Sequence, residues 1–213
     1  MREAIEAEIG SLCSSGDYAA AATLILNAYG PEISSLLRSR LCSQASGQEV
    51  YSMFCEDLWR GLPGFQRRCS VRTWVYVLAR HAELRYRSDP ARRSSRNLPL
   101  GEVELVAGTR TSTAPYCRTR FRERMRELRR RLNERDELIL LLRIDRKLAW
   151  SEIACVLSQS PAAAHAVLGR EAAALRQHFV VIKRQLRRWA EAEGLLPPAS
   201  SRATPPASQP SRD

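Results

Sequence analysis

The chain has 213 residues, with 34 Lys and Arg against 23 Asp and Glu, and a formal net charge of +11. This length accommodates one large domain or two small ones, and we expect two, each burying its own core. The basic balance favours a polyanionic partner such as DNA, RNA or an acidic protein surface.

The cysteine and histidine residues are spread along the chain. The cysteines, at positions 13, 42, 55, 69, 117 and 155, include no two within four residues of each other, and the histidines are equally isolated. Structural zinc sites use closely spaced Cys or His pairs. We therefore expect free thiols, and neither a metal site nor another cofactor.

The N-terminal segment gives no indication of export. It is polar and lacks the basic region followed by an apolar core that marks a secretory signal. No run approaches the roughly 20 apolar residues that a membrane span requires. We expect a soluble, cytoplasmic protein without a membrane span.

Helices are predicted for the first part of the chain. Asp17 is a suitable N-cap for one helix, which we expect to end at the Gly30-Pro31 pair. The apolar residues of a second predicted helix are Ile33, Leu36, Leu37 and Leu41. Gly47 is expected to open a third, QEVYSMFCEDLWRGL, which ends at the tight loop of residues 61–64. Its apolar face comprises Val50, Tyr51, Phe54, Leu58 and Leu62.

A fourth predicted helix lies within residues 65–87, FQRRCSVRTWVYVLARHAELRYR, and mixes arginines with aromatic rings. Its inward positions at helical spacing are Val71, Trp74, Val75, Leu78 and Ala82, and we expect the basic residues to lie outside. Aromatic faces stack on unpaired bases while arginines contact phosphates, so the pattern favours a single nucleic-acid strand. Trp74 falls nearly opposite Arg72 and could instead be a core residue.

The second half of the chain begins with a predicted linker at residues 88–115, which contain three prolines, two glycines and many Ser and Thr. An amphipathic helix follows, with Phe121, Met125, Leu128 and Leu132 on one face. Asn133 is expected to cap the helix ERDELILLLRI, whose core side comprises Leu138, Leu141 and Leu142.

Two further predicted helices, SEIACVL and PAAAHAVLGREAAALRQHF, are separated by a three-residue turn. Ser160 is the expected N-cap of the second, and Pro161 occupies its first position. This arrangement is typical of a helix-turn-helix motif. Residues 195–213 are expected to form a disordered tail, because they offer few apolar groups to offset the entropy of ordering.

Catalytic motifs are absent from the sequence. It contains no glycine-rich phosphate loop, nucleophile elbow or paired-carboxylate motif. Asp136 and Glu137 lie beside a predicted N-cap, where acidic groups favour the helix dipole. We expect a protein that is not an enzyme.

The segments LWRGLPGF and SVRTWVYVLAR, followed after the linker by LNERDELILLLR and SEIACVL, carry a family resemblance. Their order, over roughly residues 16–180, resembles the extracytoplasmic-function branch of the sigma-70 family of bacterial RNA polymerase sigma factors. The resemblance implies an all-α fold of two small helical domains joined by a flexible linker. Residues 1–87 would form a region 2-like bundle and residues 116–194 a region 4-like helix-turn-helix domain.

The resemblance implies two sites in the first domain. In the family, this domain captures the melted minus-ten strand, and the matching residues are Phe65, Gln66, Arg67, Arg68, Ser70, Arg72, Thr73, Trp74, Tyr76 and Arg80. It also binds the polymerase clamp, and the matching residues are Glu49, Met53, Glu56, Asp57, Leu58 and Trp59. Leu58 and Trp59 could instead be core residues. The sequence departs from the family at Met53, usually acidic, and at His81 and Arg85, usually asparagine and aspartate.

The second domain is implied to recognise a minus-thirty-five element. Its DNA-contacting candidates are Ser160, His165 and Arg170. The recognition helix otherwise presents alanines and Gly169 where relatives usually carry polar readers, so base-specific contacts are expected to be few. Five basic residues beyond them could contact the DNA backbone or form a solvated face: Arg176, Lys183, Arg184, Arg187 and Arg188.

These features favour a sigma factor that binds core RNA polymerase and directs promoter recognition and melting. An anti-sigma protein is a further partner that the resemblance allows. One alternative is a sigma-like regulatory protein that binds polymerase or a regulator without selecting promoters. Another is a helical RNA-binding protein that acts without polymerase.

Overall fold

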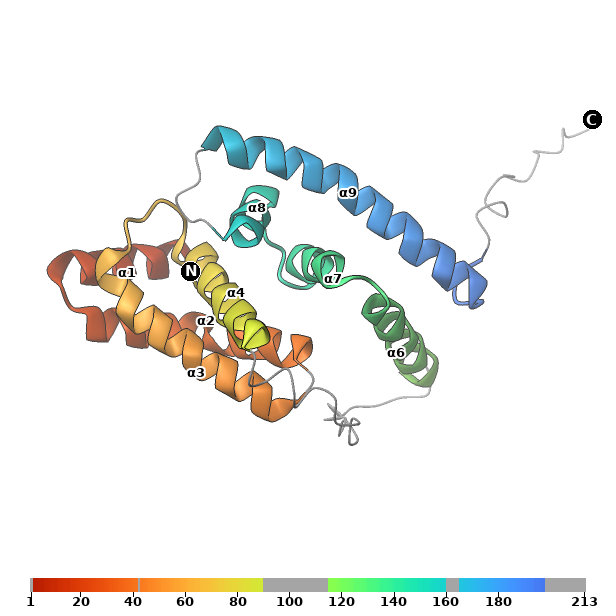
Figure 1. The fold of residues 1–213 in the computed structure, drawn as a ribbon, viewed down its shortest axis with the longest axis horizontal. Coiled ribbons are helices and arrows are strands. Elements are labelled where there is room, and N and C mark those ends of the chain that lie inside the picture. The colour runs from red at the N-terminus through yellow and green to blue at the C-terminus, as the bar shows by residue number, and fades with distance from the viewer. Residues whose placement is uncertain (1, 42, 90–114, 160–164, 198–213) are drawn as a thin grey trace, which may run out of the picture. The chain divides into compact units, whose positions relative to one another are not determined.

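The computed structural model describes residues 2–41, 43–89, 115–159 and 165–197 (Figure 1). All regular secondary structure in these segments is helical, which confirms the predicted all-α class. No helix in these segments is long and apolar enough to cross a membrane. Most of the predicted linker, residues 90–114, and most of the predicted tail, residues 198–213, lie outside the described residues.

In the first part of the chain, helices joined by short loops begin at Arg2. Its elements are α1 (Arg2–Ser15), α2 (Tyr18–Arg40), α3 (Gln44–Gly61), the 3₁₀ turn η1 (Leu62–Gly64) and α4 (Val71–Ser88). Asp17 caps α2 as predicted, its side chain accepting a hydrogen bond from the backbone N–H of Ala20. No sequence pattern indicated α1, which lacks a strong apolar stripe and buries only Ile9 and Gly10.

Two predicted helix boundaries are wrong. Pro31 lies inside α2, so the Gly30-Pro31 pair does not divide it. Proline removes one backbone hydrogen bond, but apolar residues are buried on both sides of this point, and their packing offsets that loss. Likewise α3 begins at Gln44 with Ser43 as N-cap, and Gly47 lies within the helix, tightly packed against Arg38.

The later elements match the predicted order. They are α6 (Pro115–Arg130), α7 (Glu134–Leu140), the π-helical turn η3 (Leu141–Asp145), α8 (Trp150–Ser158) and α9 (His165–Ala192). Asn133 caps α7 as predicted, accepting from the backbone N–H of Asp136. Of the predicted inward residues, Leu128, Leu132, Leu138 and Leu142 are buried, whereas Phe121 is exposed.

The described residues form two compact units that divide the chain differently from the expected domains. The first unit contains α1 to α4 together with residues 149–172, which include α8 and the start of α9. The second contains α6, α7, η3 and the rest of α9. The assignment of α8 to the first unit follows from its packing against α4. The expected boundaries at residues 87 and 116 do not anticipate this contact.

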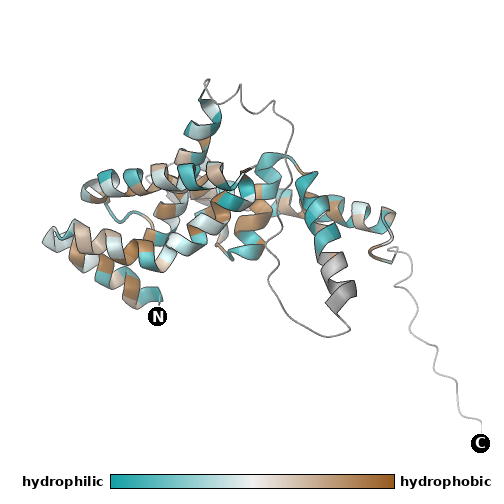
Figure 2. Ribbon diagram, turned by 90° about the horizontal axis from the view of Figure 1, so that it is seen from below, coloured by the Kyte–Doolittle hydropathy of each residue, from teal (hydrophilic) through white to brown (hydrophobic). Residues whose placement is uncertain are grey.

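The first unit has an apolar core formed mainly by α2, α3 and α4. Its largest fully buried side chains include Ile25, Ile33, Phe54, Leu58 and Tyr76. Hydrophobic and hydrophilic residues alternate around the helices (Figure 2), as expected when each helix buries only one face.

A buried ionic cluster links α2 to α4. The carboxylate of Glu83, on α4, accepts from Arg40 Nε at 2.9 Å, Arg80 Nη1 at 2.7 Å and Arg87 Nη2 at 2.8 Å. Burial lowers the pKa of Arg40, and the charge of Glu83 opposes that effect. Arg80 and Arg87 are therefore drawn inward from the face on which the sequence predicted them to be exposed.

Replacing Glu83 by glutamine tests this cluster. Because the change leaves three neighbouring guanidinium groups without their shared carboxylate, we expect the free energy of unfolding to fall by about 3–5 kcal/mol. Urea denaturation provides the measurement. The matched control is Glu56→Gln, which loses only an exposed ion pair with Arg60 and should change stability by less than about 0.5 kcal/mol. Equal small losses in both variants would show that the cluster is not a structural requirement.

Candidate nucleic-acid interface

The loop that joins η1 to α4, residues 65–70, contains five of the residues predicted to hold a promoter strand. Phe65 stacks on Trp74 of α4, with ring centroids 4.5 Å apart and an interplanar angle of 24°. Trp74 is buried, and a Cβ added at Gly61 would lie 3.0 Å from its ring. Gln66, Arg67, Arg68 and Ser70 are exposed. The loop is thus anchored by a stacked aromatic pair and presents polar and basic side chains outward.

Arg67 connects this loop to α1. Its φ is 55°, in the left-handed region that residues other than glycine rarely adopt. Its guanidinium lies directly over Gly10, where an added Cβ would be 2.5 Å from Arg67 Cζ. A side chain at residue 10 would displace the Arg67 guanidinium, the flexible end of that side chain, from this position. Arg68, the next residue, is exposed and is the better candidate for a phosphate contact.

Three carboxylates from three different helices converge on the first turn of α4. Glu6 of α1 accepts from the backbone N–H groups of Val71, at 2.7 Å, and Arg72, at 3.1 Å. Glu32 of α2 pairs with the Arg72 side chain. Glu152 of α8 accepts from Thr73 Oγ1 at 3.0 Å. Acidic groups are stabilising at a helix N-terminus, where backbone N–H groups are unsatisfied and the dipole is positive.

Two of these carboxylates also shift the pKa values of neighbouring side chains. Tyr29 donates a hydrogen bond to Glu6 Oε1 at 3.0 Å, and burial together with the charge of Glu6 raises the pKa of Tyr29 to about 12. Burial alone would lower the pKa of Arg72, but its hydrogen bond to Glu32 and the charge of that carboxylate raise it. Arg72 is therefore held as a cation inside the unit.

The predicted strand-binding residues of α4 are largely internal. Arg72, Thr73, Trp74 and Tyr76 are 6%, 2%, 5% and 1% exposed. Arg72 lies over the ring of Tyr76 at 5.5 Å, and the Tyr76 hydroxyl donates to Glu32 Oε1 at 2.7 Å. The expectation that the basic residues of this helix lie outside is wrong for Arg72. Contact between these side chains and a nucleic-acid strand stays a prediction, whereas their packing within the unit is observed.

The predicted polymerase-binding residues of α3 divide into exposed and internal groups. Trp59 is 56% exposed, and Glu49 and Glu56 are also exposed, whereas Leu58 is buried in the core. Met53 is half-buried. Asp57 is partly buried and accepts from Arg85 of α4 at 2.6 Å. Leu58 and Trp59 were both possible core residues, and the structure buries Leu58 and exposes Trp59.

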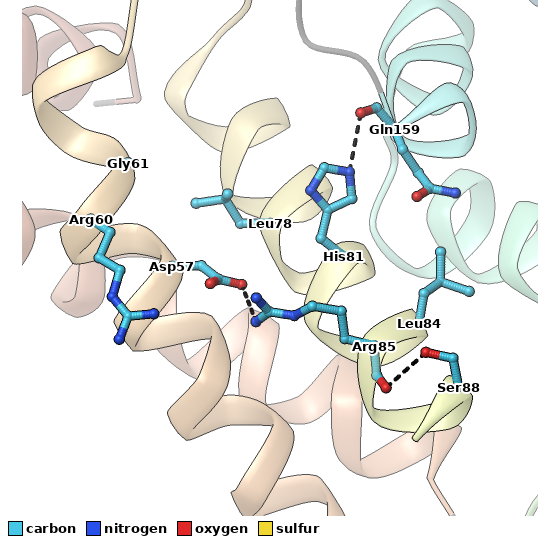
Figure 3. A pocket seen from close by; sticks show the side chains of 9 residues that line it. All are labelled: Asp57, Arg60, Gly61, Leu78, His81, Leu84, Arg85, Ser88 and Gln159. Atoms are coloured by element: carbon cyan, nitrogen blue, oxygen red, sulfur yellow. Dashed lines mark hydrogen bonds and ion pairs between the residues drawn. The ribbon is translucent and has the colours of Figure 1, made fainter. Parts of the chain in front are cut away.

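A pocket of about 660 Å³ opens between α3, α4 and the end of α8 (Figure 3). The Asp57–Arg85 ion pair lies along one side, and Leu78 and Leu84 supply apolar surface. His81 Nε2 lies 3.1 Å from the carbonyl oxygen of Gln159. His81 and Arg85, the two departures from the family pattern on α4, therefore both make contacts at this pocket.

The helix-turn-helix prediction is only partly covered by the described residues. Ser160 lies outside them, and the structure describes His165 only as the first residue of α9. Arg170 is exposed. The basic residues Arg176, Lys183, Arg184, Arg187 and Arg188 are all exposed along α9. In the second unit, His178 of the same helix bonds Asp136 Oδ1 at 2.6 Å.

The carboxylates that organise this region were not predicted from the sequence. Glu6 lies on a helix that was not predicted, and Glu32 follows the proline that was expected to end a helix. Glu152 was placed on a helix, but nothing in the sequence indicated that α8 would pack against α4. No three Cys, His, Asp or Glu side chains in the described part of the chain are grouped to hold a metal ion.

Comparison with known proteins does not identify a family. No family model matches this chain. The curated proteins compared with it also give no match.

Alanine substitutions at Arg72 and Arg68 test whether the first side chain is internal and the second is exposed. Arg72→Ala should lower the free energy of unfolding by about 3 kcal/mol, because it leaves the partly buried Glu32 without its paired charge. Arg68→Ala removes an exposed side chain and should change it by less than about 0.5 kcal/mol. Urea denaturation of both variants checks the comparison. A stability loss from Arg72→Ala as small as that from Arg68→Ala would contradict the internal role of Arg72.

Proposed function

We propose that this chain is a sigma factor of the extracytoplasmic-function type, a non-enzymatic subunit of bacterial RNA polymerase. It would bind the core enzyme and direct promoter recognition and melting. The observation that carries the proposal is the exposed loop of residues 65–70, held at its base by the Phe65–Trp74 stack. A loop with basic and polar side chains beside an aromatic pair is suited to hold an unstacked base and its phosphates.

Exposed Trp59 supports a protein partner on the neighbouring helix. Tryptophan carries much apolar surface, and the exposed part of Trp59 is available to a partner. Tryptophan is also enriched among residues that dominate binding energy at protein interfaces. Trp59 and the exposed Glu56 lie on α3, the helix that the resemblance assigns to the polymerase clamp. In this proposal α3 carries the polymerase contact and the adjoining loop carries the DNA contact.

The exposed arginines and lysine of α9 support a second contact with DNA. Five cationic side chains along one helix favour the phosphate backbone, whose binding is electrostatic and independent of sequence. Arg170, also exposed, is the candidate base reader on the described part of α9. This helix would therefore position the chain on DNA more than it would select a minus-thirty-five sequence.

One observation favours the alternative of a sigma-like regulatory protein. Arg72, Thr73 and Tyr76 are buried, and Thr73 is bonded to Glu152 of α8. A protein that retained this arrangement could bind polymerase or a regulator without handling a promoter strand. The two functions differ in a measurable property, which is transcription from a defined promoter.

Two alanine variants test the division of roles. Wild-type chain should retain core polymerase in a pull-down and yield transcripts carrying a shared minus-ten motif from a randomised promoter library. Trp59→Ala should reduce polymerase capture about tenfold or more, as expected for loss of an interface tryptophan worth about 2 kcal/mol. Arg68→Ala should leave capture unchanged and weaken affinity for single-stranded minus-ten DNA several-fold, with a smaller dependence on salt.

Each outcome discriminates between the candidates. Capture of polymerase without transcripts would favour the regulatory protein. Binding of RNA without any capture of polymerase would favour an independent RNA-binding protein. If Arg68→Ala and Trp59→Ala reduced capture equally, the proposed separation of the two surfaces would be incorrect.

A further inference from the structure

Helix α1 contributes little to the apolar core, but it contacts the loop of residues 65–70 and the start of α4. Of its residues only Ile9 and Gly10 are buried. Glu6 and Gly10, about one helical turn apart on α1, make the contacts with α4 and with the loop. These contacts suit α1 to hold the loop in place.

The Glu6 carboxylate fixes the point where the loop ends. It accepts hydrogen bonds from the backbone N–H groups of Val71, at 2.7 Å, and Arg72, at 3.1 Å. The hydroxyl of Tyr29, on α2, donates to the same carboxylate at 3.0 Å. Hydrogen bonds to a charged acceptor are stronger than neutral ones. Glu6 therefore ties the first residues of α4 to both α1 and α2.

Gly10 leaves room on α1 for the side chain of Arg67. A Cβ added at Gly10 would lie 2.5, 2.6 and 2.7 Å from Arg67 Cζ, Nη2 and Nη1. Because these three distances are nearly equal and the one to Cζ is the shortest, the flat face of the guanidinium lies against the helix at this point. A residue with a side chain would occupy the same space.

The backbone of Arg67 depends on contacts of this kind. Its φ of 55° lies in the left-handed region, which costs free energy for residues other than glycine and persists where the surroundings hold it. The contacts with α1 lie at Arg67 itself and at Val71, four residues later. They therefore restrain both the middle of the loop and its end.

We propose that Glu6 and Gly10 are positioning residues, through which α1 holds the loop of residues 65–70 in the conformation that binds a single nucleic-acid strand. The inference rests on the proposed function for its ligand, whereas the restraint on the loop does not. A loop already held in its binding conformation loses less conformational entropy when the strand binds, and this strengthens binding. The exposed Arg68 is then presented to the strand by a backbone that α1 maintains.

Three alanine variants of the full chain test the proposal. Glu6→Ala removes the carboxylate, and Gly10→Ala displaces the Arg67 guanidinium. Glu8→Ala is the matched control, because it removes the same charge from an exposed position on the same helix. Alanine favours a helix more than glycine does, and the displaced atoms are the end of a flexible side chain. Gly10→Ala should therefore leave the free energy of unfolding, measured in urea, unchanged or higher.

Timed digestion with trypsin measures the restraint on the loop directly. Trypsin takes an arginine side chain into its specificity pocket, so Arg67, held against α1, should be cut more slowly than the exposed Arg68. Cleavage after Arg67, followed by mass spectrometry, should become about fivefold faster in Glu6→Ala and Gly10→Ala. Glu8→Ala should match the wild-type chain. An unchanged rate in Gly10→Ala would overturn the proposal.

Binding assays separate this inference from the proposed function. Titration with labelled single-stranded minus-ten DNA should show about fivefold weaker binding by Glu6→Ala and Gly10→Ala than by Glu8→Ala, with capture of core polymerase unchanged. Faster cleavage with unchanged DNA affinity would overturn the role of α1 in binding, and so would an equal loss of polymerase capture in Gly10→Ala. Faster cleavage in the variants of a chain whose wild type binds no DNA would support the restraint and contradict the proposed function.

Discussion

The first turn of α4 is held by acidic side chains from three other helices, and the candidate interface depends on that arrangement. Glu6 satisfies backbone N–H groups of this turn, Glu32 binds Arg72, and Glu152 binds Thr73. A helix N-terminus with unsatisfied donors would be costly beside an apolar core. Because the carboxylates come from α1, α2 and α8, this one turn fixes three helices relative to α4. It also fixes where the preceding loop leaves the core.

This constraint separates residues that the sequence grouped together. Arg72 and Tyr76 serve the interior through Glu32, whereas Arg68 projects from the loop. The Phe65–Trp74 stack anchors the loop to the helix. A chain rich in arginine can thus use some of these residues as internal cations and others for a polyanionic partner. Charge and spacing alone do not distinguish the two uses, because the distinction depends on where carboxylates from distant segments arrive.

Local features of the fold were predictable from the sequence, and long-range contacts were not. The caps Asp17 and Asn133 and the all-helical class follow from residue type and helical spacing. The continuation of α2 through Pro31 does not follow from residue type, because packing on both sides of the proline outweighs the proline's local preference to end a helix. The exposure of Trp59 and the burial of Leu58, adjacent on α3, likewise depend on neighbouring helices. The docking of α8 on α4 required the structure.

The central claim is that the loop of residues 65–70 contacts a single nucleic-acid strand when the chain is bound to polymerase. Photo-cross-linking tests it most directly, with a promoter whose non-template minus-ten strand carries a photoreactive thymine analogue. Mass spectrometry then locates the cross-linked residues. We expect cross-links within residues 65–70, and a loss of their yield in Arg68→Ala. Cross-links confined to α9, or to the polymerase subunits alone, would contradict it.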